Sequence, residues 1–232
     1  MHSFLIGTGY SVIYYITLAS LALIIRMFTK VYDELFRKIL HFILLGSIFV
    51  YLYCFENWYT SAASCLIFSA AVYPALKFFE RFRGYSHLLT ERSSGELKNS
   101  LLIVFFMFSV VIFVCWGILG DRLLCLASVL AWGIGDAMAA LIGKRFGKHK
   151  IKNTKKSYEG TSAMFLSSFL SVLTILVIRG GINIIFSIVV SAVTALVASV
   201  TELYTTGGND TITCPIASMI VIIIMLYLFG GI

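Results

Sequence analysis

The feature that most constrains this 232-residue chain is a series of long, uninterrupted apolar segments. A membrane-spanning helix needs roughly 17–25 predominantly apolar residues, and eight segments meet that requirement. They cover residues 4–25, 39–55, 60–79, 100–119, 121–143, 161–178, 182–203 and 214–231. Their apolar residues are continuous rather than alternating, which argues against a membrane β-barrel. The sequence therefore predicts an all-α, polytopic transmembrane helical bundle of about eight spans. Seven spans stay an alternative, because segment 39–55 is short and contains His41 near its start.

The amino-acid composition supports the same class. Hydrophobic residues make up 59% of the chain and charged residues 12%, whereas soluble globular proteins average roughly 45–50% and 25%. This balance excludes a soluble enzyme, a disordered chain and a disulfide-stapled secreted module. The five cysteines are scattered singly, so we expect small packing residues rather than bridges or metal ligands. We expect a single integral membrane domain over residues 1–232, whose first segment is a span and not a removed signal peptide.

The positions of the basic residues predict how the chain is oriented in the membrane. The net charge is +7, and all lysines and arginines except Arg122 and Arg179 fall in 26–38, 77–98 and 144–156. These three connections lie on one side of the membrane if the N-terminus is outside. Because cytoplasmic loops are enriched in Lys and Arg, we expect them to face the cytoplasm. The loops expected to carry functional motifs are residues 26–38, 80–99, 144–160 and 204–213.

An acidic residue, Asp136, lies inside the fifth predicted span. It precedes Gly143 by seven residues, which places it about 10 Å inside the cytoplasmic end of that span. A carboxylate at such a depth costs about 2.5–3.5 kcal/mol on insertion scales and is a functional candidate by default. The alternative is a structural charge paired with a neighbouring Lys or Arg.

The connection after this span has the composition of a phosphate-binding loop. It combines ammonium groups, glycines that allow close backbone approach, and hydroxyl side chains at the start of a helix, whose free N–H groups attract anions. Its candidates for nucleotide or phosphate binding are Gly143, Lys144, Gly147, Lys156, Ser157, Glu159 and Gly160. It is not a Walker A loop, because GxxxxGK[ST] is absent. The alternative is that its lysines only set the topology.

Two basic clusters precede Asp136 on the same predicted side. Arg37 and His41 share a helix face and Lys38 lies beside them, although snorkelling at the interface would explain this group equally well. Arg92 and Glu96 form a second candidate pair, for which a local salt bridge is the simpler explanation.

Two further acidic residues, Glu202 and Asp210, follow near the inner end of the seventh span and before the eighth. Together with Asp136 they offer hard oxygen ligands, which suit a Mg²⁺ ion that also binds substrate phosphates. The alternative for Gly207–Asp210 is an ordinary turn. A transporter places its ionisable groups near the midplane, whereas these groups gather at the cytoplasmic ends of the spans, as expected of an enzyme acting on a lipid headgroup.

Taken together, these segments resemble the family of CTP-dependent lipid kinases that includes dolichol kinase, phytol kinase and a eukaryotic diacylglycerol kinase. The resemblance covers residues 37–215 and rests on Arg37-Lys38-x-x-His41, Arg92…Gly95-Glu96, Gly135-Asp136-Ala137-x-Ala139-Ala140-x-Ile142-Gly143-Lys144-Arg145-Phe146-Gly147, Lys156-Ser157-x-Glu159-Gly160 and Glu202…Gly208-x-Asp210-x-x-Thr213-x-Pro215. The chain departs from the family pattern at Thr211, where an Asn usually follows the Asp.

The resemblance implies transfer of the terminal phosphate of CTP to a lipid alcohol such as a polyprenol, phytol or diacylglycerol. It implies Mg²⁺ or another divalent cation as cofactor, and as partners a nucleoside triphosphate, a lipid alcohol and membrane lipid, with no nucleic acid; a homo-oligomer is left open. The roles that it suggests are catalysis by Asp136, His41 and Glu96, phosphate binding by Lys38, Arg92, Lys144 and Lys156, and metal binding by Asp136, Glu202 and Asp210. We expect the plasma membrane in a prokaryote, and the endoplasmic reticulum or a plastid-type membrane in a eukaryote.

Two alternatives remain open. The stretch from Gly143 to Gly160 also resembles part of phosphatidate cytidylyltransferase, which makes a CDP-lipid, but the C-terminal PGHGG signature of that enzyme is absent. A transporter or flippase with a basic inner mouth is the alternative from a different functional class.

Overall fold

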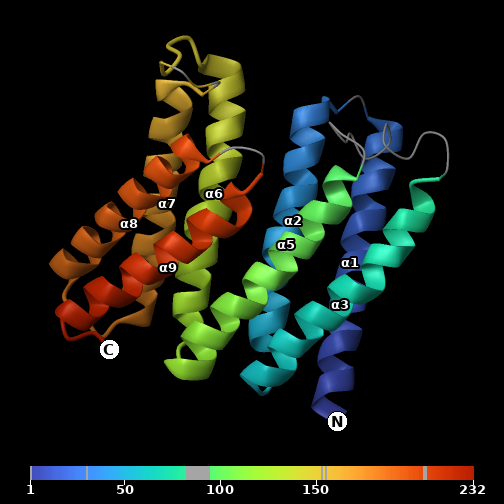
Figure 1. The fold of residues 1–232 in the computed structure, drawn as a ribbon, viewed down its shortest axis with the longest axis horizontal. Helices are drawn as coiled ribbons and strands as arrows, with labels where there is room; N and C mark the ends of the chain where they lie inside the picture. Colours follow the sequence, from blue (N-terminus) through green and yellow to red (C-terminus); the bar gives the residue numbers. More distant parts are fainter. Residues whose placement is uncertain (1, 30, 82–94, 153, 155, 206–207) are drawn as a thin grey trace. The chain divides into compact units, whose positions relative to one another are not determined.

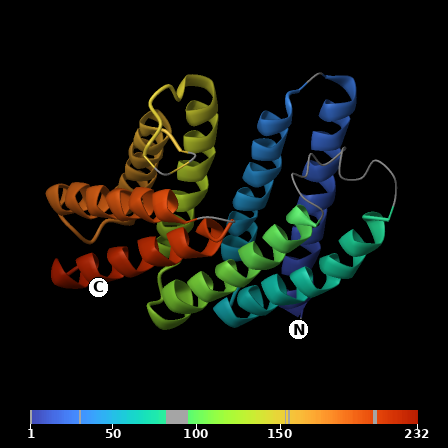
Figure 2. The same cartoon turned by 45° about the horizontal axis from the view of Figure 1, so that its top comes forward.

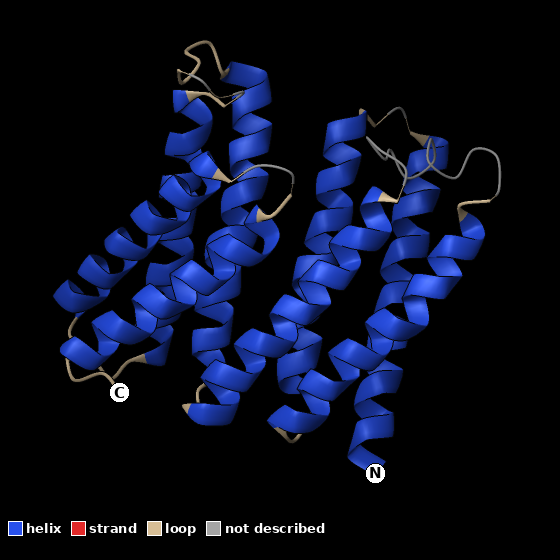
Figure 3. Ribbon diagram, viewed as in Figure 1, coloured by secondary structure: helices blue, strands red, loops and turns tan. Residues whose placement is uncertain are grey.

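A computed structural model describes the whole chain except residues 1, 30, 82–94, 153, 155 and 206–207. The described residues form helices and loops, and no strand occurs among them (Figure 3). The helices, labelled in Figure 1, are α1 His2–Phe28, α2 Asp33–Tyr53, α3 Trp58–Phe79, α5 Glu96–Val111, η1 Ile112–Ile118, α6 Arg122–Phe146, α7 Tyr158–Arg179, α8 Ile184–Tyr204 and α9 Asp210–Leu228. Eight helical segments in this part of the chain are long and apolar enough to cross a membrane, with α5 and η1 forming one of them. The all-α, eight-span prediction is confirmed, while the orientation of the N-terminus stays a prediction.

Several helices extend past the apolar segments that predicted them, chiefly at their polar ends. The clearest case is α2, which begins at Asp33 instead of residue 39. Asp33 and Glu34 occupy its first turn, where negative charges interact favourably with the helix dipole. Hydropathy detects only the membrane-embedded part of a helix, so the charged turns of α2 were missed.

The end of the fourth span is wound as a π-helix, η1. The N–H of Leu119 donates to the carbonyl of Val114 at 3.2 Å, five residues earlier. Such wide turns are rare and occur often at functional sites. The sequence did not predict this segment, because no residue type marks a π-helix.

The chain divides into two compact units, residues Met1–Phe113 and Val114–Ile232. In the first unit α1 packs on α2, and α3 packs on α5. The interior of this unit is aromatic: the ring of Tyr15 stacks on Phe68 at 4.8 Å between centroids, and Phe68 meets Phe105 edge-on at 5.2 Å. Tyr51 is fully buried beside the same Phe105 ring.

The second unit is built around α6, which contacts α7, α8 and α9. Much of α6 is buried, and its contact with α7 uses small residues. The hydroxyl of Ser168 on α7 donates to the carbonyl of Ala131 on α6 at 2.6 Å. A Cβ atom on Gly135 would lie only 2.5 Å from the Ser168 hydroxyl oxygen. Small residues therefore let these two backbones approach closely, as in other membrane helix pairs. On the other side of the unit, α8 and α9 lie next to each other (Figure 2).

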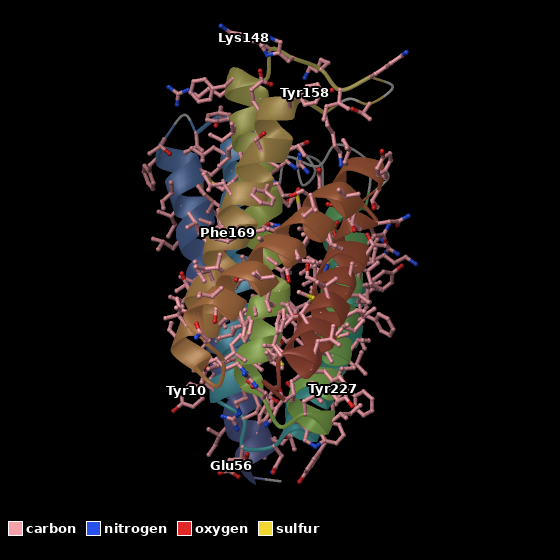
Figure 4. All side chains as sticks on the ribbon, turned by 90° about the vertical axis from the view of Figure 1, so that its left-hand side faces the viewer. Tyr10, Glu56, Lys148, Tyr158, Phe169 and Tyr227 are labelled. Carbon is pink, nitrogen blue, oxygen red and sulfur yellow. The ribbon has the colours of Figure 1, made fainter. Side chains whose placement is uncertain are left out.

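One end of the second unit is closed by a network around Asp121. Its Oδ1 accepts from the N–H groups of Leu123 and Leu124 at the start of α6, and its Oδ2 accepts from Arg179 Nε at 2.5 Å. Arg179 also donates to the carbonyl of Gly231 at 2.8 Å. In this unit the basic α6–α7 connection lies at the opposite end, as Figure 4 shows with Lys148 and Tyr158 at one end and Tyr227 at the other.

Candidate functional site

The candidate site of the second unit is organised by the basic connection between α6 and α7. Its backbone folds back on itself: the N–H of Ile151 donates to the carbonyl of Lys156, and the N–H of Tyr158 donates to the carbonyl of His149, both at 3.0 Å. Lys150 and Ser157 form an antiparallel bridge between these two bonds. The connection is therefore held in a short hairpin against the start of α7.

The glycines of this connection pack the two helices together around Ser157. The Ser157 hydroxyl, 3% exposed, accepts from the N–H of Gly160 and caps α7. A Cβ atom on Gly160 would lie 3.0 Å from the Ala139 carbonyl oxygen, and one on Gly147 would overlap the carbonyl of Gly143. We call Gly143, Gly147, Ser157 and Gly160 the α6–α7 seam. Phosphate binding by the seam residues stays a prediction, and the geometry gives them a packing role.

The carboxylate of Glu159 forms hydrogen bonds with the α6–α7 connection. Its Oε1 accepts from the backbone N–H groups of Lys148 at 3.3 Å and His149 at 3.2 Å, and it lies 2.7 Å from Nδ1 of His149. A carboxylate and a phosphate are both negatively charged, so Glu159 does not attract a phosphate directly. Sequence reasoning did not single out His149, and only its position ten residues before Glu159 could have suggested the contact.

Lys156 connects the basic loop to α8. Its Nζ lies 2.6 Å from Oε1 of Glu202 and also donates to the carbonyl oxygen of the same residue. Glu202 is 7% exposed, so the ion pair is largely removed from solvent on the acidic side. A predicted phosphate ligand and a predicted metal ligand, 46 residues apart, are thus brought into direct contact.

The other two carboxylates of the predicted metal set lie near this pair. Asp136 on α6 and Asp210 at the start of α9 are both within electrostatic range of Glu202. Their like charges repel one another, which a bound cation would relieve. No three His, Cys, Asp or Glu side chains lie close enough to hold a metal among themselves within the described residues. Mg²⁺ is usually held by one or two carboxylates together with substrate phosphates and water, so a site built from one or two of these carboxylates stays a prediction.

Lys144 lies in the last turn of α6 and is exposed. The other candidates lie in the first unit. Lys38 is buried on α2, next to an ion pair in which Arg37 lies 3.2 Å from Glu34, and His41 meets Phe42 edge-on. Glu96 begins α5, but its side chain lies outside the described residues, as does the whole of Arg92.

The first unit also contains an ion pair that the sequence did not predict. Lys98 on α5 and Glu80 after α3 are 2.7 Å apart. Gly95 precedes α5 with a φ of 77°, a left-handed conformation that favours glycine.

Comparison with known proteins finds relatives in the family that the motifs resemble. The chain is 30% identical to the phytol kinase of Synechocystis over 175 residues, which is 75% of this chain and 68% of that protein. It is 31% identical to human dolichol kinase over 166 residues, which cover 64% of this chain but only 30% of the human protein. A 45-residue stretch is 58% identical to a dolichol kinase of Schizosaccharomyces pombe, covering 19% of this chain and 9% of that one.

No protein-family profile matches the chain, and neither does any solved structure. The chain spans about a third of the length of human dolichol kinase and two thirds of the Synechocystis phytol kinase. The identity extends over most of the chain, and the eight apolar helices found in its described part suit an enzyme that works on lipids within a membrane. The chain belongs to the family of membrane lipid kinases that includes phytol kinase and dolichol kinase.

Proposed function

We propose that this lipid kinase transfers the terminal phosphate of CTP to the hydroxyl of an isoprenoid alcohol or diacylglycerol. One observation carries the proposal beyond the family: the Lys156–Glu202 ion pair holds the basic α6–α7 connection against a carboxylate whose charge interacts with those of Asp136 and Asp210. Cations for the triphosphate and anions for a metal or a proton are both needed in phosphoryl transfer, and here they meet at one end of the second unit.

The reaction asks the protein mainly to position its substrates and neutralise charge. The hydroxyl oxygen of the lipid forms a bond to the terminal phosphorus, the bond from that phosphorus to the nucleoside diphosphate breaks, and the hydroxyl proton leaves. Lys144 and Lys156 would bind the phosphates, and Asp136 would accept the proton or orient the hydroxyl. One or two of the carboxylates of Asp136, Glu202 and Asp210, together with the phosphates and water, would hold Mg²⁺, which when bound neutralises phosphate charge.

Lys156 has to change partners in this scheme. In the structure its ammonium is bound to Glu202, so a triphosphate must compete with that carboxylate for it. A cation bound near Glu202 would lower the cost of this exchange, because it would replace the positive charge that the lysine removes. The nucleotide and the divalent cation would therefore each bind the protein more tightly when the other is present.

The orientation follows from the basic connections. We propose that they face the cytoplasm and that the N-terminus lies outside, so that the site draws its nucleotide from the cytoplasm. Asp136 lies within the α6 span, and we propose that the lipid hydroxyl approaches it there.

The test is an activity matrix of purified protein in neutral lipid nanodiscs. CTP, ATP, UTP and GTP, each labelled at the terminal phosphate, are offered with Mg²⁺ to phytol, a polyprenol and diacylglycerol. We expect labelled lipid phosphate with CTP and one lipid class, and its loss in Asp136→Asn. A parallel reaction with phosphatidate and CTP labelled at the first phosphate would yield labelled CDP-lipid if the protein were a cytidylyltransferase. Nucleotide-independent lipid flux without phosphorylation would instead support a flippase.

A further inference from the structure

We infer that Glu159 is a positioning residue, which with His149 sets the conformation of the basic α6–α7 connection. The inference rests on the proposed function for its kinetic consequences, while its structural consequences stand independently. Glu159 is the second residue of α7 and lies two residues after the Ser157 cap. Its carboxylate is therefore attached to the capped first turn of α7.

The contacts of Glu159 all reach back to the other arm of the hairpin. The backbone N–H groups of Lys148 and His149 donate to Oε1, and His149 also approaches Oε2 at 3.4 Å. The His149 ring adds a contact from Nδ1 at 2.7 Å, in which the ring nitrogen must be the protonated one because a carboxylate only accepts. Two backbone donors and one ring donor thus converge on one side chain.

These contacts supplement a hairpin that has few bonds of its own. The described backbone pairing between the two arms consists of Ile151 with Lys156 and Tyr158 with His149. Lys148, which precedes this pairing, is held to α7 through Glu159. Without that carboxylate, the segment leaving the seam at Gly147 would have fewer bonds to α7.

The consequence concerns the two lysines beside His149. The backbone bends at His149, and the His149 ring contacts Glu159. Lys148 and Lys150 flank this bend, and both are exposed. Glu159 in this way presents two cations to phosphate groups without binding phosphate itself.

Two phosphate sources fit exposed lysines at this position: the triphosphate of the nucleotide and the anionic headgroups of the membrane surface. The chemistry is the same in both cases, an ammonium against a phosphate oxygen. The two sources differ in their dependence on lipid composition, which the experiment below uses.

The first measurement is hydrogen exchange of the intact protein in nanodiscs, which does not depend on activity. Glu159→Ala should raise the exchange rate of a peptide containing the Lys148 and His149 amides by about tenfold, the effect of losing roughly one hydrogen bond's free energy. Glu159→Gln keeps an acceptor and should preserve most of the protection, while His149→Ala should have an intermediate effect. Glu56→Gln, an exposed carboxylate in the connection before α3, serves as the matched control. Unchanged exchange in Glu159→Ala would overturn the inference.

The second measurement separates positioning from folding. Glu159→Ala should raise the KM for nucleotide about threefold to tenfold with kcat kept within about twofold, as expected for lost binding contacts, and Glu159→Gln should largely restore it. Lys148→Ala/Lys150→Ala should raise the same KM, and adding Glu159→Ala should then have little further effect. Lys77→Ala, an exposed cation on α3, should change nothing.

Repeating the KM measurement in nanodiscs with and without anionic lipid identifies which phosphate group the two lysines bind. An effect of the lysine variant that persists in neutral lipid supports the nucleotide, and one confined to anionic lipid supports the membrane surface. An equal fall in kcat and unfolding midpoint for Glu159→Ala and Glu159→Gln would overturn the positioning role. Absence of any kinase activity would instead refute the proposed function and leave the exchange result standing.

Discussion

The α6–α7 seam predicts opposite effects for two glycine-to-alanine changes that look alike in the sequence. At Gly160 an added Cβ would lie 3.0 Å from the Ala139 carbonyl oxygen and 3.2 Å from the Cα of Gly143. Both neighbours are backbone atoms, so the helices themselves must move apart. At Gly143 an added Cβ would meet the Ser157 hydroxyl at 3.4 Å and the Cα of Gly160 at 3.5 Å, which is ordinary van der Waals contact.

The sizes of the two effects follow from this geometry. Overpacking a tight contact costs about 1–3 kcal/mol, and alanine recovers at most about 0.5–1 kcal/mol over glycine within a helix. Gly160→Ala should therefore destabilise the fold by about 1–2 kcal/mol. Gly143→Ala should be neutral or stabilising by up to about 1 kcal/mol.

The assay is thermal unfolding of the detergent-solubilised protein, followed by circular dichroism. In a chain of this size 1 kcal/mol shifts the midpoint by about 2–4 °C, so the midpoint of Gly160→Ala should lie several degrees below that of Gly143→Ala. The nucleotide KM is then measured for Gly143→Ala. If Gly143 admits a phosphate, as its sequence context suggests, KM should rise although the fold is intact. Equal midpoints, or a greater loss for Gly143→Ala than for Gly160→Ala, would refute the packing argument.

Three further changes test the site and its surroundings. Asp136→Asn keeps the size of the side chain but removes its charge, so turnover should fall at least about a hundredfold at unchanged expression and unfolding midpoint; activity near that of the unmodified protein would contradict a central role. Lys156→Ala removes a phosphate ligand and leaves the buried Glu202 without this partner, so both the nucleotide KM should rise and the midpoint should fall, and a change in lipid KM alone would be inconsistent with the proposal. Arg179→Ala breaks the ion pair with Asp121 at the opposite end of the second unit, so it should cost about 1–3 kcal/mol of stability while steady-state kinetic constants stay the same; altered kinetics without lost stability would show that this end affects the reaction.

The number of spans could be predicted from the sequence because a bilayer imposes a minimum apolar length on every crossing helix. The same constraint explains the errors at helix ends. Residues Asp33 to Lys38 continue α2 as a helix outside the apolar region, where hydropathy has no signal. The π-helix Ile112–Ile118 was unpredictable for a different reason, since its winding depends on hydrogen-bond register and not on residue type.

The candidate site was predictable as a set of residues but not as a set of contacts. The cost of an acid inside a span marked Asp136, and charge marked the loop. The pairing of Lys156 with Glu202 depends on how α7 and α8 pack, which no local pattern encodes. The sequence neighbours of Glu159 group it with the phosphate ligands, although its negative charge favours a different partner.

The closeness of α6 and α7 also restricts the route of the acceptor lipid. Along this pair the Ser168 hydroxyl reaches the Ala131 carbonyl, and a methyl group at Gly160 would press on backbone atoms 3.0 Å and 3.2 Å away. An acyl or prenyl chain could enter between these two backbones only by breaking this hydrogen bond and separating the packed helices. Under the proposed function, lateral entry from the bilayer toward Asp136 must therefore occur along another side of α6.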